Sequence, residues 1–467
     1  MEFKFEKTKH TFAELALLAV FAFGLLLAAI LVATRNKIEL TEPIKIPFDG
    51  ISVKLPTGPN WHRYPQWKFS RPDNAFILEA VLKRTPRPEA KVSWQYYLAH
   101  EKSGIDRLIE RISNQRNYTK VSRAETKIGS ITFTILIFSS KLSAEDYYAV
   151  ADLPSGRHIR LEVQTLADSR LAKRLFEEML NNFSFKPDKR VDDGKQFVQS
   201  LKKTGAAELI EDVTNEKTNK AYLVKQTGSS FSNGSLNFTP GRYSGFLVDK
   251  FHIIEDSDSG KSLQAKSITW LSGKNNLSIS ALFDCDSSIE YFRWQLKKNS
   301  SQNRHTQKIE IEFANGTMRV YNLSMSNPYD NERQFSPAPS ALPDIFIESI
   351  AARFLDYGTD EILIDLIFPE GTITPASIKK IPPKNSFAET GNTVSAVRFK
   401  LYDKPENLLE VYFDSSRNII ARAEKSEQLF KLETADLEKI YSEFEQSRSI
   451  IQNMIKRQPG EKLKKQQ

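Results

Sequence analysis

The chain has 467 residues, which at roughly 100 to 200 residues per domain indicates two or three domains. Hydrophobic residues make up 40% of the chain and aromatic residues 11%, which excludes a disordered polymer. The formal net charge is 66 − 58 = +8, a mild excess that excludes a dedicated nucleic-acid binder. The single cysteine, Cys285, excludes an intramolecular disulfide and a multi-cysteine metal site.

An apolar run near the N-terminus predicts a membrane-spanning helix. Leu15 to Ala33 is uncharged throughout and close to the roughly 20 residues that cross a bilayer core. Residues 1–14 form a short cytosolic flank, and the run is longer than a usual cleavable signal core, so we expect an uncleaved signal anchor at residues 15–34. Basic residues nearly balance across the run, which leaves the orientation open. A single span before a long soluble body favours the inner or plasma membrane, with the body outside the cytosol.

After a linker at residues 35–47, short alternating segments predict an α+β domain at 48–186. We expect strands at Ile51–Leu55 and Phe76–Leu82, and two helices around Trp94–Leu98 and Ile105–Ile112. A meander of four strands should follow, at Tyr118–Lys127, Ile131–Ser139, Tyr147–Leu153 and His158–Thr165. A helix capped by Asp168 or Ser169 closes this domain, with its apolar residues on one face.

This order of elements resembles the DcrB/PsbP-like domains of exported proteins. Leu55-Pro56, followed by Trp61, opens the segment, and Phe176 to Phe185 closes it. The resemblance covers about Phe48 to Lys186. It implies an accessory or assembly subunit, and it carries no shared catalytic set that could be transferred to this chain.

The charged segment 187–194 predicts a linker, and the next part, 195–432, an antiparallel β domain. Its long, evenly spaced strands predict a strongly curved sheet or half-barrel, interrupted by a Ser/Pro-rich loop from Ser326 to Pro343. Ile345–Phe354 and a C-terminal helix at 433–457, capped by Thr434, are expected to cover edge strands. A basic disordered tail, 458–467, ends the chain. The predicted fold class is therefore α+β: a transmembrane helix, a sandwich-like domain and a curved β-sheet with a C-terminal helix.

The second domain resembles, in its strand rhythm, the LolA-type periplasmic half-barrels. The hairpin that runs from Val411–Asp414 to Ile419–Arg422 carries the resemblance. Half-barrels of this type hold acyl chains in an apolar concavity, so the resemblance implies a carrier. It transfers no ligand-binding residue.

Two short motifs imitate reactive sites. Gly260-Lys261-Ser262 reproduces the end of a phosphate-binding loop, but carboxylates at Glu255, Asp256 and Asp258 would repel an anion, so a hairpin turn is favoured. Asp284-Cys285-Asp286 imitates the paired aspartates of haloacid dehalogenase phosphatases.

Those enzymes continue with Gly-Thr, whereas Ser287-Ser288 follows here, so a strand-end turn with a half-buried thiol is favoured. The histidines show no metal-ligand spacing: His10, His62, His100, His158, His252 and His305. We therefore predict no catalytic, cofactor-binding or metal-binding residue, and no cofactor.

The sequence favours a non-catalytic, membrane-anchored, envelope-facing binding or assembly protein, with an envelope protein or lipid as partner and no nucleic acid. The alternative is a tethered carrier of a lipid or acyl chain in the half-barrel. A third hypothesis is a hydrolase whose site is assembled by folding. The first two differ in whether the inward face of the strands from Tyr243 to Leu282 encloses an apolar cavity of ligand size.

Overall fold

A computed structural model describes most of the chain beyond its N-terminal segment. The described residues are 16–26, 38–83, 89–100, 108–110, 112–114, 118, 120–139, 145–165, 169–211, 213, 219–227, 231–232, 235–236, 243–256, 260–271, 277–300, 306–324, 332–382, 393–403, 406–425 and 429–456. Residues 16–26 are helical, while Leu15 and residues 27–33 of the predicted span lie outside the described residues. Among the described helices, none combines the length and apolar character needed to cross a membrane.

The N-terminal unit is built on an antiparallel sheet of eight strands in the order β10-β11-β12-β13-β8-β7-β5, with β6 also paired to β7. The strands are β5 Trp61–Arg63, β6 Lys68–Ser70, β7 Ala75–Leu82, β8 Ala90–Tyr97, β10 Lys120–Ile128, β11 Ile131–Ser139, β12 Glu145–Asp152 and β13 His158–Thr165. The predicted four-strand meander is confirmed, because β10 to β13 pair consecutively. Helix α3, Ser169–Asn181, covers one face with Leu175 and Met179 fully buried.

Two small sheets complete this unit. Strand β1, Glu39–Leu40, pairs with β4, Pro56–Thr57, and β3, Ile51–Val53, lies between β2, Ile44–Lys45, and β14, Ser184–Phe185.

The predicted helix at Trp94–Leu98 is wrong, because these residues belong to β8 and the turn that follows it. Val92, Trp94 and Tyr96 all lie on one face of the strand and are fully buried, which is the period of two that a strand requires. The second predicted helix is supported in part: residues 108–110 and 112–114 are helical, and Leu108 and Ile112 pack against Leu136 of β11.

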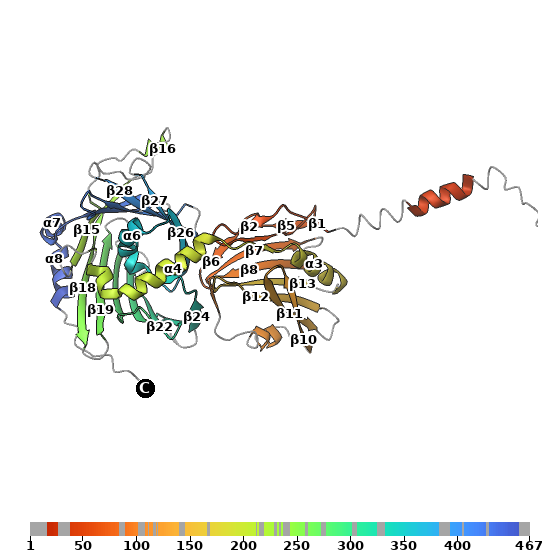
Figure 1. The fold of residues 1–467 in the computed structure, drawn as a ribbon, viewed down its shortest axis with the longest axis horizontal. Helices are drawn as coiled ribbons and strands as arrows, with labels where there is room; N and C mark the ends of the chain where they lie inside the picture. Colours follow the sequence, from red (N-terminus) through yellow and green to blue (C-terminus); the bar gives the residue numbers. More distant parts are fainter. Residues whose placement is uncertain are drawn as a thin grey trace, which may run out of the picture.

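The second unit is a sheet of sixteen strands that curls into a nearly closed barrel (Figure 1). Its order is β25-β26-β27-β28-β29-β30-β31-β15-β18-β19-β20-β21-β22-β23-β24-β9. The strands are β9 Ala99–His100, β15 Asn219–Thr227, β18 Gly245–Asp256, β19 Gly260–Leu271, β20 Leu277–Cys285, β21 Tyr291–Ser300, β22 Thr306–Ala314, β23 Thr317–Asn322, β24 Arg333–Pro337, β25 Ala341–Pro343, β26 Glu361–Ile367, β27 Ile373–Ile381, β28 Ser395–Leu401, β29 Leu408–Phe413, β30 Ile419–Lys425 and β31 Leu429–Thr434. A separate hairpin joins β16, Phe231–Ser232, to β17, Ser235–Leu236.

The barrel closes at a seam, residues 333–343, where β24 runs directly into β25. These two strands lie at opposite ends of the barrel's strand order, with only β9 beyond β24, so the chain itself bridges the gap. The chain is thus mostly β, and the α+β prediction holds only for the helices that pack on or inside its sheets. The second unit is therefore more closed than the half-barrel that the spacing of its strands predicts.

Helices fill the barrel. Short helix η2, Asp344–Phe346, leads into α6, Ile347–Asp356, which lies within the ring of strands (Figure 1). Phe346 meets the inward-facing Phe283 of β20 with ring centroids 5.9 Å apart. The prediction that this segment covers an edge strand is therefore wrong. Ile347, Ile350 and Phe354 are almost fully buried, as expected of a helix enclosed by a barrel.

Helix α4, Lys189–Thr204, begins where the sequence predicts a linker. Asp188 caps it by accepting a hydrogen bond from the Arg190 backbone N–H. Of the charges at residues 189–193, Lys189 pairs with Asp193, and Arg190 pairs with Glu361 of β26. Its apolar side contacts α6 through Phe197 and Phe354, whose ring centroids lie 5.8 Å apart. Helix α5, Ala206–Glu211, follows and also packs into this core.

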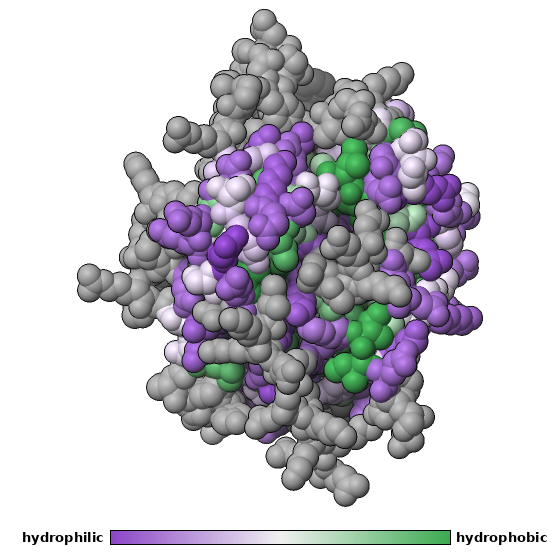
Figure 2. Space-filling model, turned by 90° about the vertical axis from the view of Figure 1, so that its left-hand side faces the viewer, coloured by the Kyte–Doolittle hydropathy of each residue, from purple (hydrophilic) through white to green (hydrophobic). Residues whose placement is uncertain are grey.

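The C-terminal segment is a strand and two helices rather than one helix. Residues 429–434 form β31, and α7, Leu437–Glu443, and α8, Ser447–Lys456, follow, with Asp436 rather than Thr434 capping α7. Ile440 and Ile451 pack on the outer face of the barrel against Leu223 and Phe246. Figure 2 faces this side and shows a mainly hydrophilic surface broken by separate hydrophobic patches.

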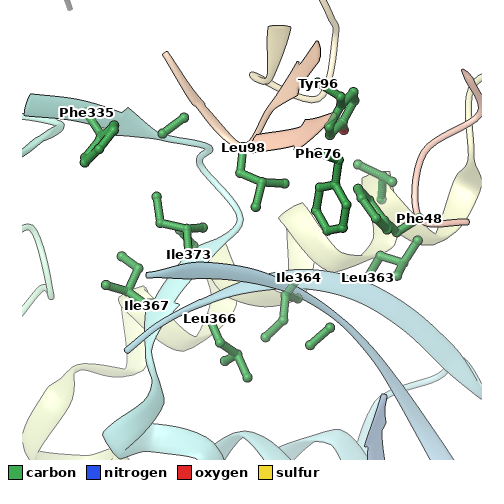
Figure 3. Packing of buried hydrophobic residues seen from close by; sticks show 14 of the residues in the cluster. Phe48, Phe76, Tyr96, Leu98, Phe335, Leu363, Ile364, Leu366, Ile367 and Ile373 are labelled. Atoms are coloured by element: carbon green, nitrogen blue, oxygen red, sulfur yellow. The ribbon is translucent and has the colours of Figure 1, made fainter. Parts of the chain in front are cut away.

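The two units share one hydrophobic core. Phe48, Phe76 and Leu98 of the N-terminal unit face Leu363 and Ile373 of the barrel (Figure 3). Strand β9 of the N-terminal unit also pairs with β24, which adds it to the barrel sheet. Autonomous folding of residues 48–186 remains a prediction, and such a fragment would expose this shared apolar surface to water.

Candidate binding pocket at the barrel seam

A pocket of about 300 Å³ lies where the seam meets helix α4. We call it the seam pocket and define it by Lys202 and Gln199 of α4, the turn residues Ile289 and Glu290, Phe292 of β21, Phe313 of β22, Ile367 of β26, and Pro339 and Pro343 of the seam. The elements that line it are far apart in the sequence, so only the closing of the barrel creates it. Its volume is at the lower end of the range for small-molecule sites.

The interior of the seam pocket is aromatic and aliphatic. Phe292 and Phe313 are cross-strand partners on the inward face, and their rings stack with centroids 5.0 Å apart at an angle of 17°. Ile367 and two prolines add apolar wall. Phe292 and Ile367 are 1% exposed and Phe313 8%, so these side chains form a closed wall behind the pocket rather than an open apolar surface.

The rim of the seam pocket carries one charge of each sign. Lys202 Nζ lies 3.1 Å from Glu290 Oε1, and the two side chains are 20% and 59% exposed. An exposed ion pair of this kind contributes about 1 kcal/mol or less, so a competing ligand could separate it at small cost.

A strained turn places two of these residues. Ile289 has a φ of 59°, which a β-branched residue rarely adopts, and it is nevertheless almost fully buried in the pocket wall. The Asp286 side chain holds the turn by accepting hydrogen bonds from the Glu290 backbone N–H at 2.9 Å and from Ser288 Oγ at 3.1 Å. Asp286 therefore has a structural role that fixes the pocket rim.

Inside the barrel, charged residues tie α6 to the wall. Lys220 Nζ of β15 lies 2.8 Å from Glu348 Oε2 of α6, both side chains being 6% exposed, and Tyr222 Oη donates to Glu348 Oε1 at 2.7 Å. Burial alone would raise the pKa of Glu348, but attraction to Lys220 and Arg422 outweighs it and lowers that pKa. Glu348 is thus held as a carboxylate, and the ion pair fixes α6 in place.

Asp249, next to this pair on β18, makes the stability depend on pH. Burial raises its pKa from 3.8 to about 6, against a hydrogen bond from Ser267 and the charge of Lys220. The folded state therefore binds this proton more tightly than the unfolded state does. Stability should fall as the pH rises from about 4 to about 6, by up to about 3 kcal/mol, and stay at the lower level above that.

Asp249→Asn should remove this loss, because asparagine does not ionise. The variant should match the native chain near pH 4 and exceed its free energy of unfolding by about 1 to 3 kcal/mol at pH 7.5. Urea unfolding at several pH values measures both. Asp356→Asn, at a largely exposed carboxylate, is the control, and its free energy of unfolding at pH 7.5 should not exceed that of the native chain. An Asp249→Asn variant with the native pH slope would contradict the assignment.

The residues of the reactive-looking motifs do not converge. Asp284 faces outward on β20 and accepts a hydrogen bond from Gln264 Nε2 at 2.6 Å, while Cys285 faces inward and is 3% exposed. The thiol is thus buried rather than half-buried, and burial raises its pKa well above the ordinary value, which disfavours the thiolate. Lys261 lies across the β18–β19 hairpin, 3.8 Å from Glu255.

Among the described residues, no group of three or more His, Cys, Asp or Glu side chains has an arrangement that could hold a metal ion. His10 and His305 lie outside the described residues. Sequence reasoning missed the seam pocket. The part of the sequence that forms one wall of the pocket is Pro337-Ala-Pro-Ser-Ala-Leu-Pro343. Its composition indicates a loop and does not by itself predict a pocket.

No protein-family model matches the chain, and no curated protein matches it. Among solved structures, the chain is similar to the crystal structure of a beta-barrel-like protein of domain of unknown function DUF1849 from Brucella abortus. The TM-score is 0.33 and the identity 11%, over 47% of this chain and 95% of that chain. The resemblances to DcrB/PsbP-like domains and LolA-type half-barrels are not shown by these comparisons. The barrel-like description of this chain therefore rests on its own strand order.

Proposed function

We propose that this chain is a membrane-anchored, envelope-facing binding or assembly protein without catalytic activity. The apolar run from Leu15 to Ala33 is the proposed anchor, and the N-terminal unit and barrel form the proposed extracytoplasmic body. The seam pocket and the surface around it provide the proposed contact with a ligand or partner.

The filled barrel is the observation that carries this proposal. Inward-facing residues of the strands from Tyr243 to Leu282, such as Phe251, Leu263 and Ala265, are only 1% exposed and share a core with α6. To admit an acyl chain there, α6 would have to leave. Exposing its three fully buried large side chains, Ile347, Ile350 and Phe354, would cost about 5 to 9 kcal/mol at about 1.5 to 3 kcal/mol each.

That cost is comparable with the whole stability of a typical domain, about 5 to 15 kcal/mol. The buried Lys220–Glu348 pair adds to it, since separating the pair leaves uncompensated buried charge. A carrier that empties its barrel is therefore the less favoured alternative. Leu247 of β18 and Ile279 of β20 are only partly buried, so the carrier alternative is best tested at this part of the barrel.

Protease added to intact spheroplasts should digest the body while leaving cytosolic proteins whole. The body should disappear at protease concentrations that spare a cytosolic marker, and detergent should not be needed. Full protection of the body until detergent is added would contradict the proposed orientation.

The same protein, purified in detergent and extracted with organic solvent, should yield less than one tightly held lipid per chain by mass spectrometry. A stoichiometric lipid would favour the carrier over the binding role.

A further inference from the structure

Strand β10, Lys120–Ile128, is a free edge of the N-terminal sheet. It stands at one end of the strand order and, among the described residues, pairs with β11 only (Figure 1). The ladder between the two strands runs without a register shift from Lys120 opposite Ser139 to Ile128 opposite Ile131. The outward N–H and C=O groups of an edge strand are open to pairing with another strand. The β10 edge is therefore a regular template of 9 residues.

The β10 edge has few of the features by which proteins protect an edge strand. It contains no proline, its ladder with β11 has no bulge, and it is longer than a typical strand. Its protection is limited to charged side chains. Arg123, Ala124 and Glu125, at its centre, are exposed to solvent. Among the described residues, none forms an ion pair with Arg123 or Glu125, so both charges are available to a second molecule.

The order of these charges matches an antiparallel copy of the same strand. When two copies of β10 pair about a two-fold axis through Ala124, Arg123 of each copy lies opposite Glu125 of the other. Ser122 of each copy then lies opposite Thr126 of the other. Opposite-charge pairs and Ser–Thr pairs both stabilise a sheet, and the symmetry forms each pair twice.

Other registers of the same pairing match less well. An axis through Arg123 or Glu125 would place two like charges directly opposite each other, which destabilises a sheet. An axis through Thr126 would pair Glu125 with Lys127, but only residues 124–128 of each strand would overlap. The axis through Ala124 alone combines overlap of the whole strand with opposite charges at its centre.

We infer that the chain forms a symmetric dimer in which two β10 strands pair about Ala124 and join the two N-terminal sheets edge to edge. A strand pair of this length extends over about 30 Å at about 3.3 Å per residue. Because such an interface is small, the dimer forms reversibly, with a dissociation constant of about 10 to 100 μM. The inference goes beyond the proposed function and does not depend on the orientation of the body or on the seam pocket.

Sedimentation velocity of the full chain in detergent, over a range of protein concentrations, tests the charge pairing. Arg123→Glu places a carboxylate opposite Glu125 of the other copy and should raise the dissociation constant at least about tenfold. Arg123→Glu combined with Glu125→Arg exchanges the two charges and should return the dissociation constant to within about threefold of the native value. Lys203→Glu makes the same change of charge at an exposed residue of α4, and association should be unchanged.

Disulfide cross-linking tests the register. Cys285 is the single cysteine and is 3% exposed, so an introduced cysteine is the accessible thiol. Ala124→Cys should form an interchain disulfide on mild oxidation, because opposite residues of an antiparallel pair have Cα atoms about 4.5 to 5.5 Å apart, within disulfide range. Ser122→Cys should not, because its two copies lie about 13 Å apart along the strands. Mixing Ser122→Cys with Thr126→Cys should restore the cross-link.

Four results would each overturn the inference. They are absence of self-association up to about 500 μM, an Arg123→Glu dimer as tight as the native dimer, failure of the exchanged charges to restore association, and cross-linking of Ser122→Cys as efficient as that of Ala124→Cys. A monomeric chain whose body is nevertheless digested by protease in spheroplasts would overturn this inference alone, and the proposed function would stand.

Discussion

Arg157→Ala should lower the free energy of unfolding by about 3 to 5 kcal/mol. Arg157 lies in the turn between β12 and β13 and is 1% exposed, and its partner Asp365, in β26 of the barrel, is fully buried. The guanidinium makes two parallel hydrogen bonds, Nη2 to Oδ1 at 2.5 Å and Nε to Oδ2 at 3.2 Å. Removing it leaves a buried carboxylate uncompensated at the contact between the two units. Urea unfolding of the full chain measures the loss.

Two further variants separate this effect from a general sensitivity to arginine removal. Arg417→Ala breaks an exposed pair with Asp356 and should cost about 1 kcal/mol or less. Replacing both residues of this bidentate pair, as in Arg157→Met with Asp365→Leu, should recover part of the stability, because Asp365 is then no longer an unpaired charge, whereas the buried Asp49, 3.9 Å from Arg157 Nη1, still loses its cation. If Arg157→Ala unfolds like Arg417→Ala, the pair does not hold the units together.

The sequence predicts the turn that carries Arg157 but not its partner. Pro154-Ser155-Gly156 is a recognisable turn, whereas Asp365 is 208 residues away and sits within an apolar strand. Local pattern identifies strands and turns because these depend on neighbouring residues. A contact between two units depends on how the whole barrel closes, and no short window of sequence contains that information.

The missed strands have specific causes. Strand β27 carries Pro375, which normally argues against a strand in the middle of a sheet, and so the pattern predicts no strand there. The seam strands β24 and β25 are short and rich in Ser and Pro, so they read as loop. The seam pocket depends on these strands and on the unusual backbone of Ile289, which is why the sequence does not predict it.

Gly194→Ala should destabilise the chain by about 3 kcal/mol or more, although alanine is the better helix former by about 1 kcal/mol. Gly194 lies inside α4, where the sequence reads as the end of a linker. A Cβ atom at this position would lie 1.8 Å from the Leu363 carbonyl oxygen and 3.3 Å from Ile364 Cγ2. The nearest atom is backbone of β26 and cannot rotate away, so α4 would have to move off the strand and disturb the core around Phe197.

Gly358→Ala is the matched control, because a Cβ atom there meets nothing within 4 Å and the backbone has no left-handed φ. That variant should be neutral or stabilising by about 0.4 to 1 kcal/mol, through a less flexible unfolded chain. Chemical denaturation of both variants compares them directly. A Gly194→Ala protein as stable as Gly358→Ala would mean that α4 does not rest on β26. The prediction of a linker at residues 187–194 would then stand. The contact that places Lys202 of α4 opposite Glu290 in the seam pocket would no longer be explained.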